Sequence, residues 1–388
     1  MTGHLMKPGV AREGEGGVGD GHRRIVYLLG AGATQGCISQ SGSQHKLVMS
    51  GLSEQISEQL NLKVIHKYED HPGIRRLFNE VVAPIPSLDI EQLITFLEDS
   101  PAGRYREFAD DLREVFSLVL RSRLRDVEAE LGSSSSWLYA VLVDMHEVAG
   151  NDERLQGFLT LNYDVFLEHA IVEGLGRGVD YGIAPSGQDE KDRPVTVLKM
   201  HGSFGWLKNW PIAAELRHGE GVWIPPGIKK AKNDYPFNII WGRARELLDC
   251  DVLRIIGCNL GPNDWDLVSL LFSTRHTHAS ARPYSVEVIS ELETADRIRE
   301  LFPYLEVRWL PELPGIGDQI VGELLGSGPR PFDNLSDELK MLATQKAKQA
   351  ISNPFSYWLT MMGETLITEG GDLSTKTGVF QDFTDRMG

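Results

Sequence analysis

The sequence FLTLNYD at residues 158–164 decides the fold that we predict for this chain. Its apolar start is typical of a short buried strand, and the polar residues Asn162 and Asp164 come where the apolar run stops. In open α/β sheets, ligands bind in the crevice outside the carboxyl ends of the strands. We therefore expect Asn162 and Asp164 to lie at a ligand site.

A second apolar run ends in a similar way. Residues 195–200 (VTVLKM) are strand-like and run into His201 and Gly202, so an imidazole is expected beside the amide of Asn162 and the carboxylate of Asp164. Each residue alone is weak support, because an asparagine after a strand is more often a turn former and a His-Gly pair is more often an ordinary loop.

A glycine-rich turn after an earlier strand strengthens the joint interpretation. Residues 24–29 (RIVYLL) have a strand pattern and run into GAGATQG at residues 30–36. Glycines at such a turn tolerate positive φ and let a diphosphate approach the backbone. The spacing G-x-G-x-x-x-G differs from the G-x-G-x-x-G dinucleotide fingerprint, so the turn alone is a weak motif.

Taken together, four ordered motifs resemble the cofactor site of the sirtuin family. They are Gly-Ala-Gly at 30–32, Thr-x-Asn-x-Asp at 160–164, His-Gly at 201–202 and Gly-x-x-Leu at 257–260. The resemblance covers roughly residues 24–327. Its insertions look like those of the sirtuin-like NADase subunits of bacterial anti-phage defence systems, most of all the subunit that is partnered with a HerA-type translocase.

Two departures from the deacetylase sirtuins count against protein deacetylation. Those enzymes carry a zinc module with two Cys-x-x-Cys pairs, because a closed structural zinc site takes four ligands. This chain has three scattered cysteines, Cys37, Cys250 and Cys258, and no Cys-x-x-Cys. The Pro-Asp-Phe-Arg stretch that covers the nicotinamide in deacetylases is replaced by CISQ at residues 37–40.

The resemblance implies hydrolysis of NAD to nicotinamide and ADP-ribose, with NAD as the substrate and no metal. Asn162 would anchor the ribose and order a water, and Asp164 would accept a hydrogen bond from the nicotinamide carboxamide. His201 would take a proton from a ribose hydroxyl or from that water, as suits a side chain with an ordinary pKa near 6.5. The other implied cofactor contacts are Gly30, Ala31, Gly32, Ala33 and Thr34 at the diphosphate and Gly257, Cys258 and Asn259 at the adenosine side.

Two other function classes stay open. One is an NAD-dependent deacylase or ADP-ribosyltransferase, which is disfavoured because the acceptor cleft and the zinc module seen in those enzymes have no counterpart in the sequence. The other is a noncatalytic sensor of NAD or ADP-ribose, which the presence of both Asn162 and His201 disfavours. Release of nicotinamide from NAD alone distinguishes the three.

Composition sets further bounds. The chain has 388 residues, 41% of them hydrophobic, enough for one large α/β core and a second lobe. No apolar run reaches the roughly 18 residues of a membrane span, and the few cysteines fit a reducing cytoplasm. The net charge of -16 makes strong nucleic-acid binding unfavourable, since phosphate neutralisation needs clustered Lys and Arg.

The pattern along the chain predicts a doubly wound, mostly parallel, Rossmann-like α/β sheet. We expect a disordered tail at 1–22, a catalytic domain at 23–327 with a helical insertion at about 45–150, and a C-terminal helical arm at 328–388. The further strands are predicted at 251–256, 284–290 and 305–310, and the helices at 47–60, 88–97, 105–131, 137–148, 264–272, 293–302 and 333–351. Asp89 and Glu91 are interpreted as capping groups at a helix that starts near Ser87, with a site role as the less favoured alternative.

Two segments are predicted to contact other protein. One is the helical arm 333–362, in which residues 355–362 carry aromatic side chains that we expect to be exposed and which is followed by a polar tail from 370; the other is the tryptophan-rich segment 206–223. Apolar surface beyond the needs of the core usually marks an interface. We therefore expect a homo-oligomer with a separately encoded partner, such as a HerA-type ATPase; the alternative is that both segments pack on their own subunit.

Overall fold

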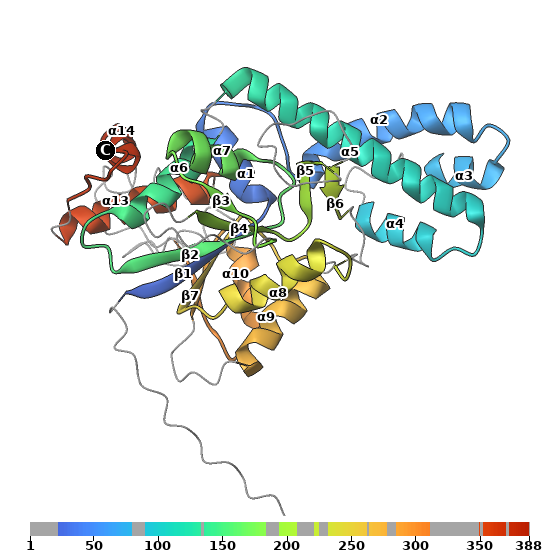
Figure 1. Ribbon diagram of the computed structural model, residues 1–388. Helices are drawn as coiled ribbons and strands as arrows, with labels where there is room; N and C mark the ends of the chain where they lie inside the picture. The colour runs from blue at the N-terminus through green and yellow to red at the C-terminus, as the bar shows by residue number, and fades with distance from the viewer. Residues whose placement is uncertain are drawn as a thin grey trace, which may run out of the picture.

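A seven-stranded parallel sheet forms the centre of the molecule in the strand order β3-β4-β2-β1-β7-β8-β9 (Figure 1). This computed structural model describes residues 22–79, 90–132, 136–183, 194–207, 221–224, 232–261, 264–277, 285–310, 349, 352–369 and 372–387. The strands of the sheet are β1 (Arg23–Leu29), β2 (Glu153–Thr160), β3 (Val179–Asp180), β4 (Val195–Lys199), β7 (Val252–Ile256), β8 (Ser285–Ile289) and β9 (Glu306–Trp309). The predicted fold class is confirmed.

The strand order reverses at β1. The chain adds β2, β3 and β4 on one side of β1 and then returns to add β7, β8 and β9 on the other side. Ligands of open α/β sheets bind at such a switch point, outside the carboxyl ends of the strands. A separate antiparallel hairpin, β5 (Gly202–Leu207) with β6 (Gly221–Trp223), follows directly after β4.

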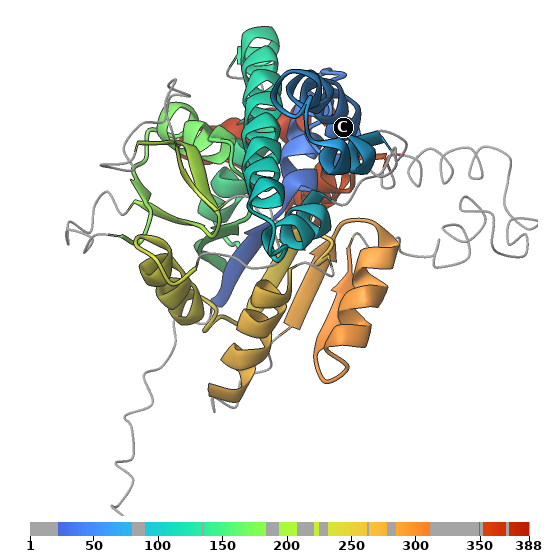
Figure 2. The same ribbon diagram turned by 90° about the vertical axis from the view of Figure 1, so that its right-hand side faces the viewer.

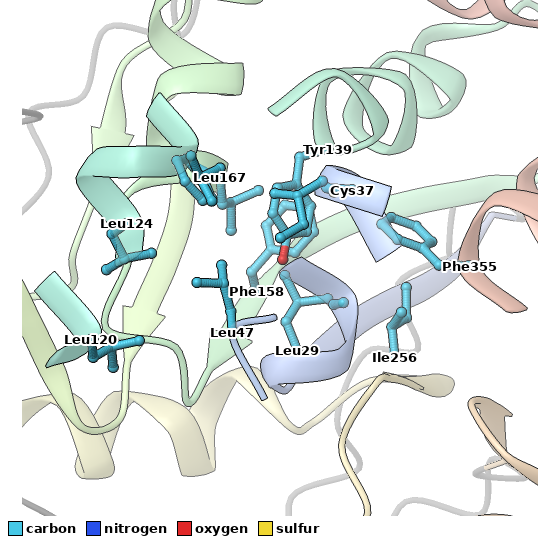
Figure 3. Close-up of a cluster of buried hydrophobic side chains, with 14 of the residues drawn as sticks. Leu29, Cys37, Leu47, Leu120, Leu124, Tyr139, Phe158, Leu167, Ile256 and Phe355 are labelled. Carbon is cyan, nitrogen blue, oxygen red and sulfur yellow. The ribbon is translucent and has the colours of Figure 1, made fainter. Parts of the chain in front are cut away.

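Successive residues of β1 face opposite sides of the sheet and enter two cores. Tyr27 and Leu29 join one cluster, part of which Figure 3 shows around Tyr139, whereas Val26 and Leu28 join the other. The first face is covered by α1 (Ala31–Gln40), α6 (Trp137–Asp144), α7 (Phe166–His169), the π-helix η4 (Ala170–Gly174), α13 (Pro354–Thr368) and α14 (Val379–Met387). The second is covered by α8 (Phe237–Leu247), α9 (Trp265–Thr277) and α10 (Leu292–Leu301).

Four of the described helices between β1 and β2 form a lobe of their own. They are α2 (Met49–Lys67), α3 (Pro72–Leu77), α4 (Ile90–Glu98) and α5 (Gly103–Leu131). The long helix α5 packs against both α2 and α4, and the lobe projects from the sheet on the side away from α13 and α14 (Figures 1 and 2). The Ser87 cap and Asp89 lie outside the described residues. None of the described helices combines the length and apolar character that crossing a membrane requires.

The C-terminal helices pack on the sheet of their own chain. Phe355 and Trp358 of α13 and Phe380 and Phe383 of α14 are buried in the core. The expectations of exposed aromatics at 355–362 and of a polar tail from 370 are therefore wrong, because these side chains lie against α1 and α6. Trp206 is also buried, while the predicted helix at 333–351 falls outside the described residues except for Gln349.

Candidate functional site

A cavity of about 400 Å³ lies at the carboxyl ends of β1, β2, β4, β7 and β8. The turns that follow these strands supply its polar lining, and the helical lobe supplies much of its apolar lining. Its position is the crevice that the strand order predicts for a ligand. Residues that are far apart in the sequence therefore line the same cavity.

The glycine turn after β1 packs directly against the turn after β7. Gly257 has φ +58, and a Cβ atom there would lie 2.0 Å from the backbone nitrogen of Ala33. A Cβ atom on Gly30 would lie 2.4 Å from the carbonyl oxygen of Gly257, and the N–H of Gly32 donates to that oxygen at 2.9 Å. Because side chains are excluded by these contacts, backbone and the start of α1 form this part of the cavity wall.

Asn162 is held by its amide nitrogen. Its Nδ2 donates to the carbonyl oxygen of Gly30 at 2.9 Å and to the Thr34 hydroxyl at 2.9 Å. Both Nδ2 hydrogens are thus used within the protein, and Oδ1 is the atom that Asn162 can offer to a ligand or a water. The amide is oriented before any ligand binds.

The Thr34 hydroxyl joins the two predicted site side chains. It donates to Asp164 Oδ2 at 2.9 Å, accepts from Asn162, and lies 2.9 Å from the hydroxyl of Tyr139. A hydroxyl has one hydrogen and two lone pairs, so with Asp164 ionised the Tyr139 hydroxyl is the donor to Thr34. The hydrogen-bonding capacity of Thr34 is then used by protein groups, and Asn162 and Asp164 are fixed relative to each other.

Asp164 is a buried carboxylate at the edge of the cavity. Its Oδ1 accepts the backbone N–H of Phe166 at 3.2 Å. Burial raises its pKa, while the positive charge of Lys199 lowers it. A carboxylate of this kind accepts hydrogen bonds strongly, because water does not compete for it.

His201 enters the cavity from the turn after β4. Its neighbour Gly202 has φ +75, and a Cβ atom there would lie 2.2 Å from the carbonyl oxygen of Val222, so the chain can turn into the hairpin at this position only with glycine. The ring of Tyr163 lies 6.2 Å from that of His201 and stacks on Phe204 at 5.1 Å. The imidazole is thus backed by an aromatic cluster.

The predicted site residues converge with one exception. The cavity is lined by Gly30, Ala31, Gly32, Thr34, Asn162, Asp164, His201, Gly257, Cys258 and Asn259. Ala33 is fully buried, and its N–H donates to the carbonyl oxygen of Gly30 at 3.0 Å. Burial raises the pKa of the Cys258 thiol to about 12, so this side chain is a neutral wall group.

Sequence reasoning missed two groups of lining residues. One is an apolar wall formed by Leu52, Phe116, Leu120 and Leu124 of the lobe and by Leu47, which precedes α2; Figure 3 shows Leu120 and Leu124 facing Leu47. The other is polar: Asp264, Ser290, Glu291 and Thr294. Ser290 is the last residue of the strand predicted at 284–290 and directly follows β8 in the structure, so the position rule used for Asn162 points to it as well. Glu91, weighed first as a cap, lies in the first turn of α4 and lines the cavity.

The cavity lining is acidic. Its charged residues are the carboxylates Glu91, Asp164, Asp264 and Glu291, and none of the described lining residues is Lys or Arg. Within the described parts of the chain, no three His, Cys, Asp or Glu side chains are grouped so as to hold a metal ion. The field in the cavity therefore favours positive charge on a bound molecule.

Comparison with known families gives a match over part of the chain. A family model described as SIR2-like domain matches residues 156–303, from within β2 to just beyond α10. The matched stretch contains Asn162, Asp164, His201 and the turn after β7, while the glycine turn at residues 30–36 precedes it. No curated protein matches the chain. The match supports a sirtuin-like family and an enzyme that uses NAD.

Proposed function

We propose that this chain is an NAD hydrolase that cleaves NAD to nicotinamide and ADP-ribose. The observation that carries the proposal is the convergence of Asn162, Asp164 and His201 on one cavity beside the glycine turn. These are the groups that the sirtuin resemblance assigns to NAD cleavage. The SIR2-like match supports NAD as the substrate.

The reaction breaks the bond between the nicotinamide nitrogen and C1′ of the ribose. The electron pair of that bond leaves with nicotinamide, and the ribose passes through an oxocarbenium-like state that a water attacks. The carboxylate-rich lining would stabilise the positive charge that develops on the ribose. Asn162 Oδ1 would orient the ribose or the water, His201 would take the proton, and Asp164 would accept from the carboxamide of the leaving group.

The test is incubation of the protein with NAD alone, with nicotinamide and ADP-ribose measured over time. Stoichiometric release of both products without any acceptor is the expected result. Cleavage that needs a protein or acyl acceptor would establish the transferase or deacylase alternative. Binding of NAD without cleavage would establish a sensor.

We also propose that the chain is the cytoplasmic, NAD-depleting effector of a bacterial anti-phage defence system. In this role it would act as a homo-oligomer with a separately encoded partner, such as a HerA-type ATPase. The support is the resemblance of the motifs and insertions. The described aromatics of 355–362 and Trp206 are buried within their own chain, so these side chains do not form the interface. Light scattering of the intact chain tests the oligomer, and a folded monomer at micromolar concentration would overturn it.

A further inference from the structure

A buried ion pair lies directly behind the turn that carries Asn162 and Asp164. The ammonium of Lys199, at the end of β4, lies 2.8 Å from a carboxylate oxygen of Glu168 in α7, and both side chains are 1% exposed. The same ammonium donates a hydrogen bond to the backbone carbonyl oxygen of Asp164. Neither Lys199 nor Glu168 lines the cavity.

Burying such a pair is costly. Each ion loses its hydration, and a pair of apolar side chains of similar volume is often as stable or more stable in the same place. On this face of the sheet the core is otherwise built largely from apolar side chains, such as Phe158 of β2 and Val195 and Val197 of β4. Packing alone therefore does not account for a lysine and a glutamate at these positions.

The ammonium completes a set of donors that hold the turn. Beyond β4, the N–H of Met200 donates to the carbonyl oxygen of Thr160 at 2.9 Å, and the Ser203 hydroxyl donates to that of Tyr163 at 3.0 Å. Lys199 supplies the donor for the next carbonyl, that of Asp164. Residues 199–203, which include His201, thus hold the backbone that carries Asn162 and Asp164.

The pair also sets the field at the Asp164 carboxylate. Charged or titratable groups reach this carboxylate from five elements: Cys37 of α1, Glu128 of α5, Tyr139 of α6, Glu168 of α7 and Lys199 of β4. Burial raises the pKa of Asp164, Lys199 lowers it, and Glu168 raises it. The cation and the anion of the pair thus act on Asp164 in opposite directions.

We infer that Lys199 and Glu168 form a positioning pair that holds the turn of Asn162 and Asp164, and that the Lys199 ammonium keeps the Asp164 carboxylate ionised for the carboxamide of the bound substrate. The inference rests on the proposed NAD hydrolase function. Glu168 holds the ammonium in place and limits its effect on Asp164. Neither residue touches the reacting atoms.

The experiment measures NAD binding rather than cleavage. In a His201→Ala background, where we expect NAD to remain intact, titration calorimetry gives the affinity for NAD between pH of about 4 and 8. Protonation of Asp164 removes the charged acceptor, so the affinity falls as the pH falls through the pKa of Asp164. Asp164→Asn in the same background should remove this dependence on pH.

The two members of the pair should move the midpoint of that pH dependence in opposite directions. Lys199→Met removes the positive charge and should raise the midpoint by about one pH unit, whereas Glu168→Gln should lower it. A general loosening of the turn would weaken binding in both variants without opposite shifts. Arg177→Met, which breaks a surface ion pair with Glu147 at 3.0 Å, is the matched control and should not move the midpoint.

Lys199→Met leaves a buried glutamate unpaired and can fail to fold. The double variant Lys199→Met/Glu168→Gln has no unpaired charge, and its midpoint should lie above that of Glu168→Gln alone. Equal midpoints, or shifts in the same direction, would overturn the positioning pair while leaving the hydrolase proposal intact. A wild-type protein that neither binds nor cleaves NAD would overturn both.

Discussion

Buried charged side chains lie at both ends of the central sheet, but their surroundings differ. Toward the amino ends of the strands, the guanidinium of Arg254 donates to Glu153 and to Glu287, and Trp358 covers it at 5.2 Å. At the carboxyl ends, Asp164 shares the cavity with Glu91, Asp264 and Glu291, and none of the described lining residues is a cation. One end neutralises its carboxylates within the protein, and the other presents them to a cavity.

Burial of charged side chains alone therefore does not mark a functional site. The Arg254 network is at least as deeply buried as Asp164, yet its charges are matched and apolar side chains cover it. Such a network contributes to the structure of the sheet. Carboxylates gathered around a cavity cost stability unless a ligand with developing positive charge uses them.

The largest expected effect comes from removing the cation Arg254 from the network at the amino ends of the strands. Arg254→Met leaves Glu153 and Glu287 buried without their shared cation, and we expect a loss of about 3–5 kcal/mol in the free energy of unfolding. Urea denaturation measures this loss. Arg308→Met is the control, because Arg308 also contacts Glu287 but is 38% exposed, and it should cost about 1 kcal/mol or less. Equal losses in the two variants would contradict the distinction.

The next effect belongs to the cavity end. Asn162→Ala and His201→Ala each remove a positioned group, and we expect NAD cleavage to fall by about 100-fold or more, which is roughly 2.7 kcal/mol of activation free energy. The free energy of unfolding should change much less. His66→Ala, on the exposed side of α2, is the matched histidine control and should leave the rate unchanged. Full activity in both site variants would contradict the roles of Asn162 and His201 in NAD cleavage.

The cavity end could be predicted from sequence because its residues follow a positional rule. Polar side chains directly after apolar strands, such as Asn162 and His201, lie at the carboxyl edge of a parallel sheet, and the predicted strands were found in that sheet. The apolar wall of Phe116, Leu120 and Leu124 was not predicted. Their helical spacing shows that one face of α5 is apolar but gives no information on what that face contacts.

The same limit explains the error at the C-terminus. The aromatic residues Phe355 and Trp358 show that a helix has an apolar face, and they were assigned to an interface. In the structure they meet Tyr139 and Arg254 of the same chain, at 5.9 Å and 5.2 Å. Only the path of the chain decides between another subunit and its own core. The strand β3 was missed because two residues are too few to show a period.

The end of the sheet that holds the Arg254 network should also make stability depend on pH. Burial lowers the pKa of His146 to about 4, and its Nε2 lies 2.8 Å from the Tyr27 hydroxyl. In the unfolded chain its pKa is near 6.5, so between about pH 6.5 and 4 the unfolded state binds a proton that the folded state does not. Acidification in this window therefore favours unfolding, and stability is regained as the pH rises.

His146 is only partly buried, so we expect its contribution to the free energy of unfolding to fall by about 1–2 kcal/mol between pH 7 and pH 5. The measurement is the difference in unfolding free energy between wild type and His146→Gln at the two pH values. The variant should lose less stability on acidification than wild type does. An equal loss in both proteins would show that His146 is not held neutral by its surroundings.

A smaller effect is expected from the acidic lining on the choice of substrate. NADP carries an additional phosphate, and a cavity lined by carboxylates without a described cation should repel it. We expect NAD to bind about fivefold more tightly than NADP, roughly 1 kcal/mol. Glu291→Gln, at the N-cap of α10, should reduce this ratio, whereas Glu293→Gln, in the first turn of α10 but outside the cavity lining, should not. A preference for NADP would contradict the acidic character of the site.

The smallest expected effect is that of metal removal, which should change neither stability nor activity. A structural zinc site needs four ligands that include thiolates, and binding of the metal contributes directly to the free energy of folding. Burial raises the pKa of Cys250 and Cys258 to about 12 and that of Cys37 well above its ordinary value, so all three favour the neutral thiol. Elemental analysis should find less than one zinc per chain, and chelation should leave the midpoint of thermal unfolding and the rate of nicotinamide release unchanged. One tightly held zinc per chain, with unfolding on chelation, would place a metal module within this chain and restore the deacetylase interpretation.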